Sequence, residues 1–391
     1  MRRIWRDFSV STWMAGFVAV LVGFTSSAAI VFSAAQALGA TPEQTVSWMW
    51  ALGIGMGVTS LGLSLWYRQP VLTAWSTPGA AVLAVSQGVT LPEATGAFMV
   101  CALSTMAVGY SGWFERLMNK IPLALASALL AGVLARFALD AVGAVAHAPA
   151  LVMAMTVAYV LGRRWWPRWS VPVVLLVGMG VAALQGQLRM SSIDWSWGLP
   201  VWVSPTWSWA AMVGVALPLF VVTMASQNLP GVAAQRASGF DIPVSPVVGA
   251  TGLASLVLAP FGGYALNLAA ITAAICMGKE AHTDPTRRYT ASVSAGVLYI
   301  ALGLAGGTIV SLMAAFPQAL VLAVAGLALL GTIASGLSVA FKDEQQRDAA
   351  LLTFLVTLSG LTLAGVGSAF WGVVVGGFAQ WFWTRRQTAS H

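Results

Sequence analysis

Residues 70–80 read PVLTAWSTPGA, and they interrupt a long apolar stretch of the chain. The segment from Val71 to Trp75 favours extended backbone, because β-branched and aromatic residues are enriched in strands. Ser76 or Thr77 is a good helix N-cap, and Pro78 suits the first helical turn. The stretch therefore predicts a short extended segment followed by a helix that begins near Ser76.

The composition around this stretch is that of a membrane protein. Of 391 residues, 58% are hydrophobic and 8% are charged, whereas soluble domains carry about 25% charged residues. A bilayer-spanning helix needs about 20 apolar residues, and the whole chain divides into runs of that kind. It is predicted to be an all-α polytopic membrane protein. The two cysteines have no ligand spacing, and no nucleophile–base pair is visible, so we expect no metal, no cofactor and no enzyme activity.

We predict about 14 spans, at residues 12–37, 44–66, 71–87, 92–112, 121–140, 148–162, 171–188, 209–236, 245–259, 260–279, 287–313, 317–340, 346–364 and 366–385. With the N-terminus inside, all but two of the 19 Lys and Arg residues lie on the cytoplasmic side; Arg136 falls within the fifth span and Arg189 outside. This asymmetry predicts that both termini are cytoplasmic. The net charge of +7 is thus a topology signal, and no nucleic acid partner is expected.

An internal repeat divides the chain. The motif LMxxIPxAL at 117–125 recurs as LMxxFPxAL at 312–320, and Ser27-x6-Ala-Ala-Gln36 recurs as Ser226-x6-Ala-Ala-Gln235. We predict two units of seven spans, at 1–188 and 209–391, joined by an interfacial or β-like segment at 189–208. Seven is odd, so the second unit is inverted, as in secondary transporters with a site near the midplane.

The second unit contains a matching interruption at residues 261–270, which read FGGYALNLAA. Gly262 and Gly263 weaken a helix there, and Asn267 is a plausible cap before the next apolar helix. Two half-helix N-termini meeting inside the membrane would offer free N–H groups and positive dipole ends to an anion such as a carboxylate. A pair of ordinary Pro/Gly kinks is the alternative.

Polar residues inside the spans are few. Gln227 and Asn228 favour a site role, because adjacent amides in a membrane helix cost free energy unless paired; interhelical hydrogen bonding is the alternative. Arg136 and Asp140 are spaced i, i+4 near the outer end of the fifth span and are expected to form a structural pair. No Asp or Glu lies deep in a span, so no buried carboxylate relay for protons is visible.

Four stretches resemble the bacterial benzoate:proton symporters of the BenE type, a similarity that runs over essentially the whole chain: TAWSTPGAA at 73–81, PLFVVTMASQN at 218–228, AITAAIC at 270–276 and GSAFWG at 367–372. That family is related to the nucleobase and sulfate permeases. The resemblance implies a 7+7 inverted repeat in the bacterial inner membrane, interleaved core and gate domains, and short strands before the half-helices of spans 3 and 10. It also implies a substrate site at Trp75, Ser76, Thr77, Ser226, Gln227, Asn228, Tyr264, Ala265 and Asn267.

Together these features predict proton-coupled import of an aromatic carboxylate such as benzoate. The carboxylate would meet the helix starts near Ser76 and Asn267, with Gln227 or Asn228 as donors, and the ring would pack on Trp75, Tyr264, Phe24 or Phe261. Nucleobase permeases carry an acid in the eighth span where this chain has amides, which favours an anionic cargo and leaves the proton-coupling residue open. Alternatives are a carrier of another organic anion or a nucleobase-like solute, a passive channel, or a membrane scaffold. A homodimer is possible.

Overall fold

The computed structural model describes residues 7–84, 86, 88–166, 170–188, 197–314, 316–361, 363 and 368–388. Arg2, Arg3, Arg6 and Arg168, which belong to the Lys and Arg residues counted above on the cytoplasmic side, lie outside the described residues, as do Arg189 and Gly367. Within them the chain is mostly helical. Six of the described helices are long and apolar enough to cross a membrane, spanning Pro42–Tyr67, Leu91–Tyr110, Leu123–Ala146, Trp209–Ala237, Val244–Phe261 and Pro285–Gly306.

The described elements are distributed over two halves of the chain. The first half contains α1 (Val10–Ala37), α2 (Pro42–Tyr67), β1 (Thr73–Trp75), α3 (Thr77–Ala84), α4 (Leu91–Tyr110), α5 (Trp113–Met118), α6 (Leu123–Gly143), η2 (Ala144–Ala146), α7 (Pro149–Trp165) and α8 (Ser170–Leu184). The second contains a long helix built of α9 (Trp209–Ala211), η5 (Met212–Ala216), α10 (Leu217–Thr223), η6 (Met224–Asn228) and α11 (Leu229–Ala237). It continues with α12 (Val244–Leu258), η7 (Ala259–Phe261), β2 (Leu266–Leu268), α13 (Ile271–Met277), η8 (Pro285–Arg287), α14 (Tyr289–Ala314), α15 (Gln318–Ala340), α16 (Glu344–Leu358) and α17 (Ser368–Thr388).

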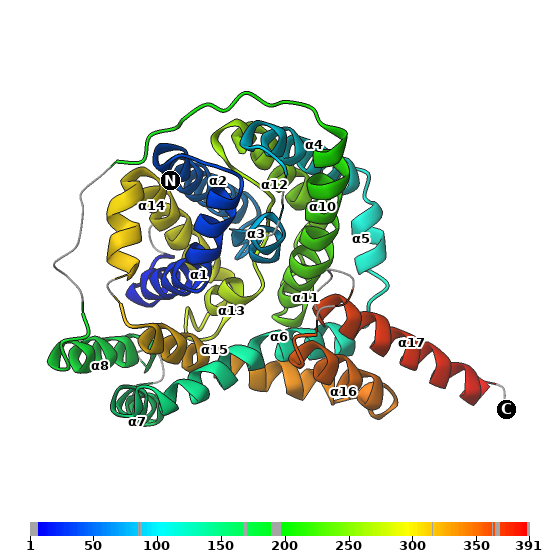
Figure 1. The fold of residues 1–391 in the computed structure, drawn as a ribbon. Coiled ribbons are helices and arrows are strands. Elements are labelled where there is room, and N and C mark those ends of the chain that lie inside the picture. The colour runs from blue at the N-terminus through cyan, green and yellow to red at the C-terminus, as the bar shows by residue number, and fades with distance from the viewer. Residues whose placement is uncertain are drawn as a thin grey trace.

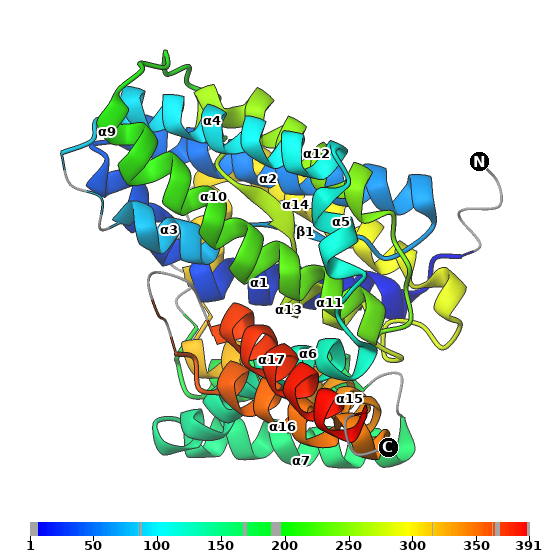
Figure 2. The same ribbon diagram turned by 90° about the vertical axis from the view of Figure 1, so that its right-hand side faces the viewer.

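The helices form two layers. A bundle contains α1–α4 and α9–α14, and a flatter layer beside it contains α6–α8 and α15–α17 (Figures 1 and 2). In the bundle, α2 packs along α14 and α4 along α12; in the second layer, α6 packs along α15 and α16 along α17. Each layer therefore combines elements from both halves of the chain.

The α2–α14 contact depends on glycine. A Cβ added at Gly53 would lie 2.6 Å from the Cα of Gly303, so the two backbones touch directly. Such close approach is typical of membrane helices, where dispersion contacts rather than water exclusion hold helices together.

The two strands meet inside the bundle as an antiparallel pair, with Ala74 opposite Asn267. The predicted strands before the two half-helices are thus confirmed. The cap of α3 is confirmed as well, because the Ser76 Oγ accepts from the Gly79 N–H at 3.1 Å. The predicted cap at Asn267 is wrong: pairing with β1 draws this residue into β2, and α13 begins four residues later at Ile271.

The described part of the connecting segment, residues 197–208, crosses one end of the bundle as irregular chain (Figure 1). Its N–H groups bond to helical elements of the bundle rather than to a strand. Val201 donates to the Ser47 Oγ at 2.8 Å, and Val203 donates to the Pro260 carbonyl at 2.8 Å. The β-like alternative is therefore wrong for these residues.

Candidate functional site

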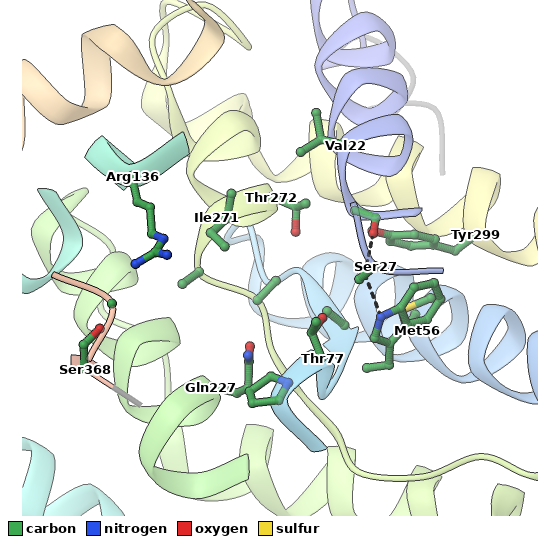
Figure 3. A pocket seen from close by; sticks show the side chains of 17 residues that line it. Val22, Ser27, Met56, Thr77, Arg136, Gln227, Ile271, Thr272, Tyr299 and Ser368 are labelled. Atoms are coloured by element: carbon green, nitrogen blue, oxygen red, sulfur yellow. Dashed lines mark hydrogen bonds between the residues drawn. The ribbon is translucent and has the colours of Figure 1, made fainter. Parts of the chain in front are cut away.

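A cavity of about 480 Å³ lies where the two strand–helix breaks face the second layer (Figure 3). Its walls come from α1, α2, β1, α3, η6, α13 and α14 of the bundle, and from α6 and the ends of α16 and α17 in the second layer. The volume falls within the range of about 300–1,000 Å³ typical of small-molecule sites. The lining is mostly apolar, with a few polar side chains.

Trp75 forms one apolar wall and is held firmly. Its indole Nε1–H donates to the Ser27 Oγ at 3.0 Å, and that hydroxyl donates to the Gly23 carbonyl at 2.8 Å. The Phe24 ring packs edge-on against the indole, with centroids 4.9 Å apart. Because its polar atom is satisfied, the indole offers the cavity an apolar surface in a fixed orientation.

Ser76 and Thr77 are adjacent but differ in role. Ser76 is fully buried, caps α3 and receives a hydrogen bond from the Thr223 Oγ1 at 3.0 Å, so it ties α3 to α10. Thr77 lines the cavity at the first residue of α3. The helix start predicted from sequence thus lies at the cavity wall, with the half-buried Thr77 as its polar group there.

Gln227 and Asn228 also divide their roles. Both lie in the π-helical segment η6, a geometry found often at functional sites. Gln227 is half-buried and lines the cavity, and its carboxamide has no hydrogen-bond partner among the described residues. Asn228 is fully buried: its Oδ1 accepts from the Leu268 N–H at 3.0 Å and its Nδ2 donates to the Met224 sulfur at 3.2 Å. Gln227 is available to a ligand, and Asn228 supports β2.

The remaining sequence-predicted residues lie away from the cavity wall. Tyr264 is buried between Trp48 and Phe98, at centroid distances of 5.5 and 5.8 Å. Ala265 has a left-handed φ of 40°. Its carbonyl accepts a hydrogen bond from the Asn267 Nδ2 at 3.0 Å.

Ser226 precedes Gln227 without lining the cavity, and Phe261 packs against Trp50 and Trp202. The cavity wall on this side is formed instead by residues 269–272, because β2 occupies the positions where the sequence suggested a helix start.

Sequence reasoning missed several lining residues. Ser27, Met56, Tyr299 and Ser368 carry no local signal that separates them from neighbouring apolar or small residues. Only Ser27 had a hint, since the repeat aligned it with Ser226.

Arg136 was not predicted to line the site, although the sequence does mark it: it is a charged residue inside an apolar span. The expected pair with Asp140 is wrong, because the described residues contain no ion pair between them. Asp140 lines a separate hollow with His147, whereas the Arg136 side chain lines the cavity beside Gly360. The helix also runs on to Gly143, so Arg136 lies in its interior rather than near its end.

Comparison with known proteins gives consistent matches over nearly the whole chain. Residues 6–382 match the family described as "Benzoate membrane transport protein", BenE. The chain is 48% identical to the "Inner membrane protein YdcO" of Escherichia coli (strain K12), covering 95% of this chain and 96% of that protein. It is 39% identical to the "Benzoate membrane transport protein" of Acinetobacter baylyi, covering 96% of each.

The fold is similar to that of a solved structure of SLC26A9. The TM-score is 0.51 at 12% identity, with 98% of this chain and 66% of that chain covered. A murine Slc26a9 structure, described as an anion transporter in the inward-facing state, gives the same TM-score and identity, with 95% of this chain and 67% of that chain covered. At this level of identity the likeness concerns the fold.

Proposed function

The chain belongs to the BenE family of benzoate membrane transport proteins, and on that premise we propose that it imports an aromatic carboxylate, such as benzoate, together with protons across a bacterial inner membrane. As a member of this family it is a membrane transport protein and not an enzyme. The proton is the proposed coupling ion.

The observation that carries the proposal is the chemistry of the cavity. An aromatic acid needs flat apolar walls for its ring and donors for its carboxylate. Trp75, Met56 and Tyr299 supply apolar surface, while Gln227 and Thr77 supply donors. The described lining holds no Asp or Glu, so no fixed negative charge there repels an anion.

We also propose that the chain crosses the membrane 14 times as a 7+7 inverted repeat, with the bundle as core domain and the second layer as gate. Reciprocal packing supports this, because α2 contacts α14 as α12 contacts α4, and α7 contacts α8 as α16 contacts α17. Local geometry agrees: Pro122 precedes α6 with φ −61° and ψ 147°, and Pro317 precedes α15 with φ −60° and ψ 136°. The asymmetry of Lys and Arg supports cytoplasmic termini.

Uptake into proteoliposomes tests the proposed function. We expect labelled benzoate to accumulate in vesicles with an acidic exterior, and the accumulation to collapse when an uncoupler dissipates the proton gradient. Vesicles without protein are the control. Uptake that never exceeds this control would refute benzoate transport, and gradient-independent equilibration would indicate a passive channel. Competition by unlabelled organic anions and by nucleobases separates the aromatic carboxylate from the alternative cargoes.

A further inference from the structure

We propose that Arg136 on α6 is the cationic group that binds the substrate carboxylate, from the layer opposite the broken helices. This inference rests on the proposed transport of an aromatic carboxylate and assigns the residue that selects the anion. It adds a specificity-determining residue to the bundle residues discussed above.

The position of Arg136 makes its charge costly. Arg136 lies in the interior of the 24-residue apolar helix Leu123–Ala146. A charge within a membrane span is expensive and is normally paired or placed at a functional cavity. Among the described residues, the ion pairs involve Arg163, Arg287 and Arg347, and none involves Arg136. An anion in the cavity would supply the missing counter-charge.

The Arg136 side chain lies at the cavity wall. Arg136 lines the same cavity as Thr77 and Gln227, and Figure 3 shows it reaching toward the cavity across from Tyr299. Gly360, at a left-handed φ of 67°, makes room for it, because a Cβ there would overlap the guanidinium group. The backbone after α16 thus leaves space for the charged group at the cavity wall.

The chemistry of Arg136 suits a carboxylate ligand. A guanidinium group presents paired N–H donors whose geometry matches a carboxylate. Gln227 and Thr77 would face the same substrate from the bundle. A bound aromatic acid would therefore contact both layers at once, with its charge at Arg136 and its ring near Trp75.

The test compares benzoate with benzamide, a neutral molecule of nearly the same shape, by equilibrium binding to purified full-length protein. The wild type is expected to prefer benzoate. Arg136→Gln should weaken benzoate binding by about tenfold or more and leave benzamide binding nearly unchanged, because only the charge-assisted hydrogen bonds are lost. Arg136→Lys should keep a preference for the anion. Arg164→Gln, which removes an exposed arginine on α7, is the matched control and should change neither affinity.

The outcomes separate this inference from the proposed function. If wild-type protein binds no benzoate, the substrate is wrong and the assignment of Arg136 falls with it. If the wild type binds benzoate and Arg136→Gln keeps both the affinity and the preference over benzamide, the role of Arg136 is overturned while benzoate transport stands. If Arg136→Gln does not fold, Gly360→Ala decides: it must displace the guanidinium group, and unchanged benzoate affinity would overturn the assignment.

Discussion

Replacing Asn228 and Gln227 by alanine, one at a time, should separate structural support from ligand binding at neighbouring positions. Asn228→Ala removes the acceptor of the buried Leu268 N–H, a hydrogen bond of 3.0 Å. An unsatisfied buried donor costs about 1–3 kcal/mol. Gln227→Ala removes a half-buried carboxamide that has no partner among the described residues, so its effect on stability should stay within about 0.5 kcal/mol.

Thermal unfolding in detergent can be followed with a thiol-reactive fluorophore, because Cys101 and Cys276 are both buried and become reactive only when the chain opens. We expect Asn228→Ala to lower the apparent Tm by about 1–5 °C and Gln227→Ala to leave it near that of the wild type. Benzoate affinity should show the opposite order. When only correctly folded protein is compared, Gln227→Ala should bind benzoate more weakly than Asn228→Ala does.

Each variant serves as the control for the other, since both shorten an amide side chain in the same π-helical segment. Equal Tm values for Asn228→Ala and wild type would refute the reasoning that this amide supports β2. Unchanged benzoate affinity in Gln227→Ala would remove Gln227 from the site.

Three further changes test the packing and the surface. Trp75→Phe deletes the hydrogen bond to Ser27 but keeps an aromatic wall. We expect benzoate affinity to fall, and the apparent Tm to drop by no more than it drops in Asn228→Ala. An unchanged benzoate affinity in titrations would contradict a positioning role for the indole. Gly53→Leu inserts a side chain where α2 touches Gly303, so an overpacking cost of about 1–3 kcal/mol or more should lower the apparent Tm, whereas Gly62→Leu, at a position with open space, is the control. The Thr286 hydroxyl and N–H donate to the Asp284 carboxylate and hold its pKa below the ordinary value. This carboxylate therefore contributes stability above its unfolded-state pKa, and that stability is lost as the pH falls through its folded-state pKa. Asp284→Asn should flatten the pH dependence of Tm in the acid range, and a pH profile identical to that of the wild type would show that these hydrogen bonds do not contribute.

Local chemistry made much of the fold predictable. The predicted bounds of α1 and α2 agree with the structure to within a few residues, because apolar runs of membrane length end at caps and turns that the sequence itself supplies. The strand before α3 and its Ser76 cap were predictable for the same reason, since a Ser before Pro-Gly sets a helix start over a few residues. The same reasoning is wrong for Asn267, because a residue that is a good helix cap lies in a strand when a distant segment pairs with it.

The amino-acid sequence by itself determined that this chain is a helical membrane protein with two interrupted apolar stretches, because hydrophobicity, charge placement and capping act over short distances. Only the tertiary structure decided which polar groups reach the cavity. Gln227 and Asn228 are neighbours in one helix, yet a side chain's role depends on what packs against its face, and of the two side chains it is that of Asn228 that hydrogen-bonds to β2. The Arg136 side chain could likewise have paired with Asp140 one turn away or have lined the cavity. It lies at the cavity wall beside the backbone of Gly360, which is more than 200 residues later in the chain.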